Sequence, residues 1–227
     1  SSTSHALIGG LIGAVAMASG FDTVKMAGLE KVLIALFLSP VLGLFLGFLV
    51  LKILYFLARG ATPKVNSVFR RAQLATSMAL ALSHGTNDAQ KTMGIIAMAM
   101  VTTGYVSDFR VPWWVIAMSA GAIALGTATG GWRLIKTLGG KFYKIRPIHA
   151  FGSQLTSASI ILGAALLGGP VSTTQVVSSA IMGAGSADRV SKVRWTVARD
   201  IAVAWVLTIP IAALMAAVLY LVIDLFL

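Results

Sequence analysis

The sequence predicts an all-α membrane protein, built as a bundle of helices. Of the 227 residues, 57% are hydrophobic and only 11% are charged, whereas a soluble domain carries about 25% charged residues. The apolar runs are long and lack the period of two that marks strands, which favours helices over a barrel. We therefore expect an integral, multi-pass protein whose first partner is the lipid bilayer.

The net charge of +11 indicates basic loops rather than a partner made of nucleic acid. Lys and Arg gather at 59–71, 133–147 and 186–199, and such residues concentrate in the cytoplasmic loops of membrane proteins. Because successive spans alternate in direction, loops 21–31 and 104–112 are then expected on the outer side of the membrane. The absence of cysteine excludes disulfides and thiolate metal sites.

The apolar runs of the first half predict two spans, one short arm and one interrupted helix. The apolar run within residues 1–20 is too short to cross a bilayer comfortably, so we expect a re-entrant half-helix or a partial span there. Residues 32–57 predict a full span, and 72–103 predict a helix whose apolar run is interrupted by polar residues. A further span is expected at 113–136, where paired tryptophans mark a membrane interface.

The second half predicts a hairpin followed by a last span. Two apolar arms within 148–185 are separated only by the Gly-Gly-Pro of 168–170, which predicts a re-entrant hairpin that returns to the same side. The last span is expected at 200–227.

The interrupted helix contains the polar residues whose placement in the membrane costs the most free energy. His84, Gly85, Asn87, Asp88 and Lys91 fall within eight residues of an otherwise apolar run. Ionisable groups at that depth cost a few kcal/mol and mark functional sites. Because Gly, Asn and Asp favour turns, we expect a helix broken near mid-membrane, with the break facing a cavity.

A repeat appears when residues 1–57 are laid on 171–227. The first hydroxyl cluster falls on the second, and Pro40 falls on Pro210. The loop charges give the two copies opposite orientations, which predicts inverted-topology repeats. We assign 1–57 to the end of a first repeat and 58–227 to a second. A first copy of the Asn-Asp stretch is then expected before Ser1, so the chain looks like a fragment.

The hydroxyl cluster of the hairpin is a candidate anion site. It follows Gly-Pro and opens a short helix, where free backbone N–H groups and the helix dipole favour negative charge. The alternative is an ordinary helix cap, but the repetition of the cluster at the start of the chain favours function. The residues are Ser172, Thr173 and Thr174, with Ser2, Thr3 and Ser4 as the first copy.

Asn87 and Asp88 are candidate ligands for a cation. Their oxygens suit a hard monovalent cation, and the carboxylate is also able to carry a proton; the alternative is a structural hydrogen-bond pair between helices. Lys91 is one turn from Asp88 and is placed to pair with it or with an anion. His84 is interpreted either as a titrating group or as an ordinary buried histidine.

Two further interpretations concern the remaining polar residues. Gln154 and its hydroxyl neighbours in the first hairpin arm either line the cavity or pack helices. A hydrolase triad of Ser172, His84 and Asp88 is a remote alternative, because their spacing resembles no nucleophile elbow. We therefore expect no enzyme and no cofactor beyond a transported cation.

Three motifs together resemble the inorganic phosphate transporter (PiT) family of secondary transporters. Residues 85–94 (GTNDAQKTMG) resemble its Gly-Ala-Asn-Asp signature, 170–175 (PVSTTQ) its Pro-Val-Ser-Thr-Thr-His motif, and 2–5 (STSH) a first copy of the latter. The sequence departs from the family in lacking the first Asn-Asp copy, and in having Gln175 where His is frequent and Lys91 where Asn is frequent.

The resemblance implies a symporter that moves inorganic phosphate inward with Na+ or H+. It implies phosphate at the six hydroxyl residues and the coupling ion, Na+ if sodium-coupled, at Asn87 and Asp88. We expect supporting roles for His84, Thr86, Lys91, Gln154 and Gln175, a prokaryotic plasma membrane as location, and a homodimer as a potential assembly. The alternatives are a carrier of sulfate or another oxyanion, and a phosphate-binding membrane subunit that does not transport.

Overall fold

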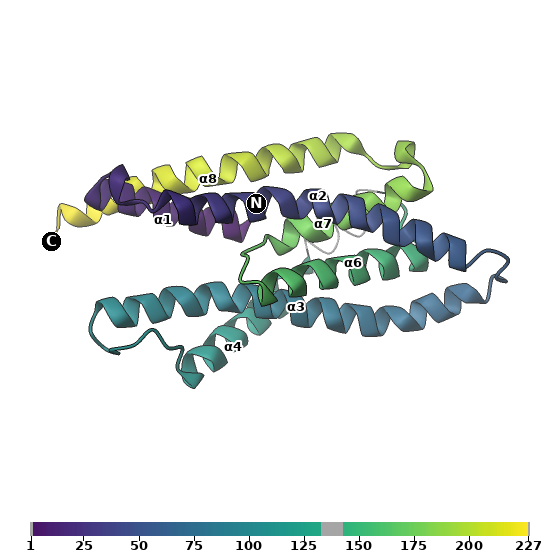
Figure 1. Cartoon of the computed structure of the whole chain (residues 1–227), viewed down its shortest axis with the longest axis horizontal. Helices are drawn as coiled ribbons and strands as arrows, with labels where there is room; N and C mark the ends of the chain where they lie inside the picture. Colours follow the sequence, from purple (N-terminus) through teal and green to yellow (C-terminus); the bar gives the residue numbers. More distant parts are fainter. Residues whose placement is uncertain (1, 133–142, 227) are drawn as a thin grey trace.

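The computed structural model describes residues 2–132 and 143–226, and these residues form helices joined by short loops (Figure 1). In order, the helices are α1 (Thr3–Ser19), the 3-10 turn η1 (Phe21–Thr23), α2 (Met26–Leu57), α3 (Val65–Thr102), α4 (Trp113–Gly130), α6 (Pro147–Leu166), α7 (Thr173–Asp188), η2 (Val190–Lys192) and α8 (Trp195–Asp224). The end of the span predicted at 113–136 lies outside the described residues.

In the described part of the chain, three helices, α2, α4 and α8, are long and apolar enough to cross a membrane. Helices α2 and α8 expose many of their large apolar side chains, among them Phe45, Phe56 and Leu214. In water such surfaces would be costly, whereas lipid tails solvate them without penalty. The fold is therefore that of a helical, multi-pass membrane protein, as the composition predicted.

The predicted break in the helix at 72–103 is wrong, because α3 runs as one α-helix of 38 residues. The segment contains no proline, and Gly or Asn inside a helix costs only up to about 1 kcal/mol each. The polar groups at its centre are satisfied across the bundle instead: the Asn87 amide donates to the Val171 carbonyl over 3.2 Å. Tertiary hydrogen bonds thus remove the need to unwind the backbone.

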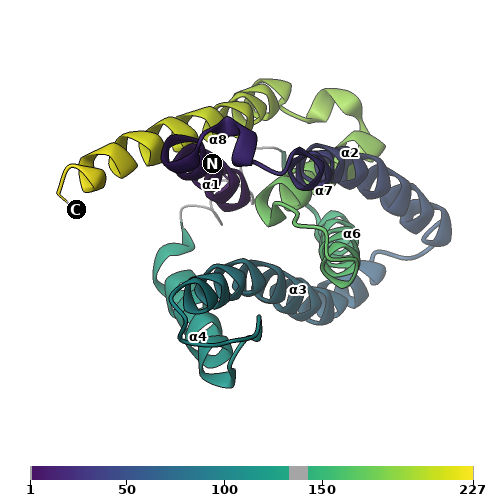
Figure 2. The same ribbon diagram turned by 60° about the vertical axis from the view of Figure 1, so that its left-hand side comes forward.

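The hairpin predicted at 148–185 is present as α6 and α7. Its turn contains Gly168 at φ +68°, a left-handed conformation that favours glycine, and the Gly169 amide donates to the Ala164 carbonyl over 2.9 Å. An apolar cluster of Ile161, Val171 and Val176 lies beneath the turn. Figure 2 shows α6 between α3 on one side and α2 and α7 on the other.

The two copies of the repeat have the same order of elements. Each has a short helix, a 3-10 turn and a long helix with an internal proline, at Pro40 in α2 and Pro210 in α8. The copies exchange partners, since α1 packs along α8 and α2 packs along α7. In Figure 1, α1 and α7 start close together and run in opposite directions. The N-termini of both short helices therefore meet at the centre of the molecule.

Glycines allow the backbones of α1 and α8, and those of α7 and α2, to approach each other closely. A Cβ added at Gly13 of α1 would overlap the Ala213 carbonyl oxygen of α8, and one added at Gly183 of α7 would overlap the Leu44 carbonyl oxygen of α2. Gly13 and Gly183 are equivalent positions in the two copies. Small residues at such crossings let backbones approach closely, which is how helices associate in lipid.

Candidate functional site

The candidate site is built where the N-termini of α1 and α7 meet. Ser2 caps α1 and Ser172 caps α7, and both side chains are buried. The Ser2 hydroxyl donates to the Ser172 hydroxyl over 2.8 Å. Residues 170 positions apart in the sequence thus touch. The two hydroxyl clusters that the sequence singled out are brought together.

The remaining hydroxyls of the two clusters take different positions. The Ser4 hydroxyl donates to the Val171 carbonyl over 3.1 Å. Thr173, the first residue of α7, is also buried. Thr174 is half-buried. Thr3 is exposed, and it lines a cavity of about 380 Å³ together with Asp88, Lys91 and Thr92. Thr3 is therefore the hydroxyl of the first cluster that faces the charged pair on α3.

The charged pair is formed by Asp88 and Lys91, one turn apart on α3. Lys91 Nζ lies 2.8 Å from Asp88 Oδ1, and the two side chains are 13% and 20% exposed, for Lys91 and Asp88 respectively. On the other side of the carboxylate, His84 Nδ1 lies 3.6 Å from Asp88 Oδ2. The Asn87 amide also donates to Asp88 Oδ1, over 3.2 Å. Of the two partners expected for Lys91, Asp88 is the one that it contacts in this structure.

The Val171 carbonyl oxygen connects the two groups of residues. It accepts hydrogen bonds from Ser4 of α1, from Asn87 of α3 and from the Lys91 ammonium at 2.9 Å. Three donors on one oxygen, two of them from α3, fix the hairpin tip against the centre of that helix. The hydroxyl clusters and the Asn-Asp stretch, far apart in the sequence, therefore form one site.

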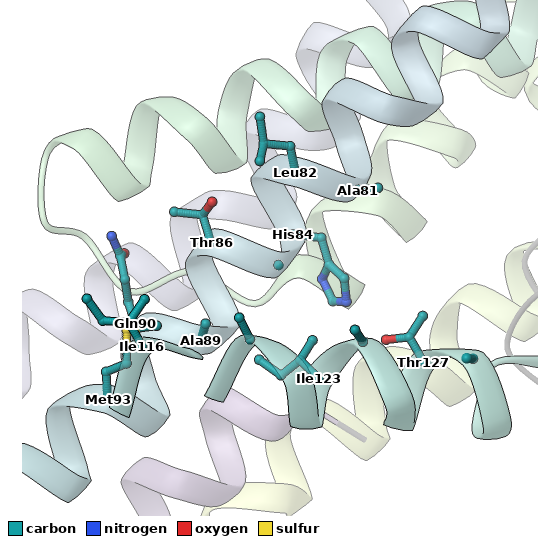
Figure 3. Close-up of a pocket in the computed structure, with 14 residues that line it drawn as sticks. Ala81, Leu82, His84, Thr86, Ala89, Gln90, Met93, Ile116, Ile123 and Thr127 are labelled. Carbon is teal, nitrogen blue, oxygen red and sulfur yellow. The ribbon is translucent and has the colours of Figure 1, made fainter. Parts of the chain in front are cut away.

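His84 and Thr86 lie at the edge of this site rather than inside it. Both line a cavity of about 750 Å³ between α3 and α4, and Figure 3 shows the His84 ring pointing toward α4 on the side of Thr127. The walls of this cavity are otherwise mostly Ala, Leu, Ile and Met. His84 is thus placed between an apolar cavity and the Asp88 carboxylate.

The two predicted glutamines have different surroundings. Gln154 accepts a hydrogen bond of 2.7 Å from Thr76, which joins α6 to α3 away from the serines, so its interpretation as a helix-packing residue fits this contact. Gln175 is buried, and its Nε2 lies 3.4 Å from His5 Nε2. Its Oε1 has no partner among the described residues.

Two contributors were missed as site residues in the sequence. His5 is fully buried, and its Nδ1 lies 2.8 Å from the Ser2 hydroxyl; the repeat offset, which puts His5 on Gln175, was the available signal. The Val171 carbonyl left no signal, because a backbone acceptor is present at every position whatever the side chain. Only its place in the fold distinguishes it.

Comparisons with known proteins identify relatives of this chain. Residues 1–216 match the model of the Phosphate transporter family. The chain is 43% identical over 226 residues to the "Probable low-affinity inorganic phosphate transporter" of Bacillus subtilis (strain 168), and 46% identical over 227 residues to the protein of the same description from Rhizobium meliloti (strain 1021). Each alignment covers 99% of this chain and 68% of the relative.

A solved structure, "The sodium-dependent phosphate transporter", superposes with a TM-score of 0.65 at 27% identity. The superposition covers 98% of this chain and 65% of that one, so the chain spans about two thirds of the length of these three proteins. This family consists of transporters and not of enzymes, which removes the hydrolase alternative. The resemblance read from the three motifs is confirmed, and the chain belongs to the phosphate transporter family.

Proposed function

We propose that the full-length protein containing this chain is a secondary active symporter, which imports inorganic phosphate with Na+ or H+. The observation that carries the proposal is the contact between the N-cap serines of α1 and α7, at 2.8 Å, next to the Asp88–Lys91 pair. Hydroxyl groups that suit an anion and a carboxylate that suits a cation then lie next to each other in one site. The printed descriptions of the relatives support the choice of phosphate and, for the solved structure, of sodium.

The anion side consists of the two helix N-termini. Each N-terminus carries about half a positive elementary charge, and the two lie together where Ser2 and Ser172 meet. We assign phosphate oxygens to the hydroxyls and free amides of both clusters, namely Ser2, Thr3, Ser4, Ser172, Thr173 and Thr174. Thr3 is the member that already faces a cavity.

The cation side consists of Asn87 and Asp88. A carboxylate at mid-helix in an apolar bundle is expensive unless a positive charge accompanies it. A cation held there would offset the cost of desolvating the phosphate beside it, so that neither ion crosses easily alone. This shared electrostatic cost is the physical basis of symport.

The membrane arrangement follows from the repeat. We propose that 1–57 and 58–227 belong to two repeats of opposite orientation, supported by the divergent directions of α1 and α7 (Figure 1), and that α1 and the α6–α7 hairpin enter the bilayer without crossing it. Bacterial relatives support a prokaryotic plasma membrane as location. A homodimer stays a prediction.

The test is phosphate uptake by the full-length protein in proteoliposomes, comparing wild type with Ser172→Ala and with Ser2→Ala/Ser172→Ala. We expect the double variant to raise the KM for phosphate at least about ten-fold, because it removes two hydroxyl groups assigned to phosphate, each contributing about 1 kcal/mol as a hydrogen bond. The matched control is Ser67→Ala, an exposed serine near the start of α3.

Two outcomes distinguish the alternatives. Unlabelled sulfate that competes with phosphate at equal concentration would identify a general oxyanion carrier. Saturable phosphate binding without uptake would identify a binding subunit. An unchanged KM in the double variant would contradict the assignment of the two serines to phosphate.

A further inference from the structure

Lys91 occupies an unusual place for a lysine in a membrane bundle. Its ammonium lies 2.8 Å from Asp88 Oδ1 and 2.9 Å from the Val171 carbonyl oxygen, with the side chain only 13% exposed. A carboxylate oxygen and a backbone carbonyl oxygen are the kinds of atoms that bind a hard cation. The ammonium therefore holds the position that a coupling cation at Asp88 would take.

The other acceptor positions around this point are also taken. The Asn87 amide donates to Asp88 Oδ1 and to the Val171 oxygen, both over 3.2 Å, and Ser4 donates to the Val171 oxygen. Asn87 thus presents its NH2 group, not its oxygen, toward these atoms. In this arrangement the residues do not fit a Na+ ion at Asp88 unless Lys91 moves away and the Asn87 amide rotates to present its oxygen.

Two cavities lie next to the Lys91 side chain and offer it alternative positions. Lys91 and Asp88 line the cavity of about 380 Å³ that Thr3 faces, and Lys91 lines a second cavity of about 170 Å³ beside the Gly168–Pro170 turn. A lysine ammonium is a point charge on a flexible four-carbon stem, so a small rotation turns it from the carboxylate toward either space. An anion bound near Thr3 or near the hairpin tip would then pair with the Lys91 ammonium.

The balance of charges at the site favours a state in which Na+ pairs with Asp88 and phosphate pairs with Lys91. Asp88 and Lys91 together are neutral when no ion is bound. With one Na+ and one monovalent phosphate bound, the four charges again sum to zero, whereas either ion alone leaves one net charge. An uncompensated charge in a low-dielectric interior is costly, so the fully empty and the fully loaded states are favoured over both half-loaded states.

We propose that Lys91 couples the two ions by exchanging partners: Na+ displaces its ammonium from Asp88 and Val171, and the freed ammonium then pairs with phosphate. This inference rests on the proposed function, since it assumes that both ions bind at this site. It assigns Lys91 two opposing effects, because the side chain competes with Na+ and assists phosphate. A lysine that merely stabilises the helix would show no such opposition.

The test measures Na+ and phosphate dependence of uptake by the full-length protein in proteoliposomes, for wild type and Lys91→Met. We expect the Na+ concentration at half-maximal rate to fall and the KM for phosphate to rise, each by about ten-fold, because charge-assisted hydrogen bonds are about twice as strong as neutral ones. Lys91→Arg keeps the positive charge and should shift both values less. Lys52→Met, on the exposed face of α2, is the matched control.

Each result decides between the proposals. The proposed role of Lys91 would be overturned if Lys91→Met raised both the Na+ concentration at half-maximal rate and the KM for phosphate, or left that Na+ concentration unchanged. The proposed symport function would not be affected by either result. Absence of phosphate uptake in wild type would overturn the proposed function instead. If Lys91→Met lowers the amount of folded protein, the pair Lys91→Met/Asp88→Asn, which has no buried charge, should restore folding and bind phosphate weakly whether or not Na+ is present. Phosphate binding that still requires Na+ in this pair would contradict the proposal.

Discussion

Asp88→Asn is expected to abolish the dependence of phosphate uptake on a cation gradient. The substitution keeps the size of the side chain and removes the negative charge that a cation needs. Lys91 then loses its partner at 2.8 Å and stays free to pair with an anion. We therefore expect equilibrium phosphate binding to persist without the cation, while accumulation driven by the cation gradient is lost.

The measurements are phosphate accumulation with and without an imposed gradient, and equilibrium phosphate binding, both in the full-length protein. Asp108→Asn is the matched control, because Asp108 lies in an exposed loop, where its carboxylate has a long contact of 3.9 Å with Arg110. Uptake that keeps its full rate and its ion dependence in Asp88→Asn would show that Asp88 is not the coupling site. A control that loses coupling as well would point to a loss of folding.

Gly13→Ala is expected to destabilise the protein far more than Gly10→Ala, although both change the same helix by one methyl group. The added Cβ at Gly13 would overlap the Ala213 carbonyl oxygen, whereas at Gly10 it meets no atom within 4 Å. Forcing α1 away from α8 has a cost of the order of overpacking, about 1–3 kcal/mol. At Gly10 the alanine should stabilise slightly, by up to about 1 kcal/mol, through helix propensity.

The measurement is the thermal unfolding midpoint of the full-length protein in detergent. We expect a midpoint several degrees lower for Gly13→Ala and an equal or slightly higher one for Gly10→Ala. Gly183→Ala should behave like Gly13→Ala, because the repeat places it against the Leu44 carbonyl oxygen in the same way. Equal midpoints for the Gly13 and Gly10 variants would contradict the close crossing of α1 and α8.

Much of the fold was predictable from periodicity and local signals. The long apolar runs gave α2, α4 and α8, and the Gly-Gly-Pro at 168–170 gave the hairpin turn, because such signals act over a few residues. The offset of 170 anticipated that each copy would contain a short helix, a turn and a long helix. The exchange of partners between the copies was not predictable, because backbone contact of Gly13 and Gly183 depends on segments far apart in the chain.

The continuity of α3 shows why the predicted break failed. Gly85, Asn87 and Asp88 lower helix propensity, and judged locally they favour a turn. The bundle supplies a partner for Asn87 that the local sequence does not show, the Val171 carbonyl, while Asp88 pairs with Lys91 one turn along the same helix. A modest loss of propensity is outweighed once each buried polar group has a hydrogen-bond partner.

The sequence by itself determined the class of the protein, the order of its helices and the chemistry of its two polar clusters, since these follow from residue types and their spacing. It also offered Asp88 as one of two partners for Lys91, the other being an anion, because the two residues lie one turn apart. Only the tertiary structure decided that Ser2 meets Ser172 and that Lys91 lies on the Val171 carbonyl. The physical reason is that these contacts join donors and acceptors from different helices, whose meeting depends on how the whole bundle packs.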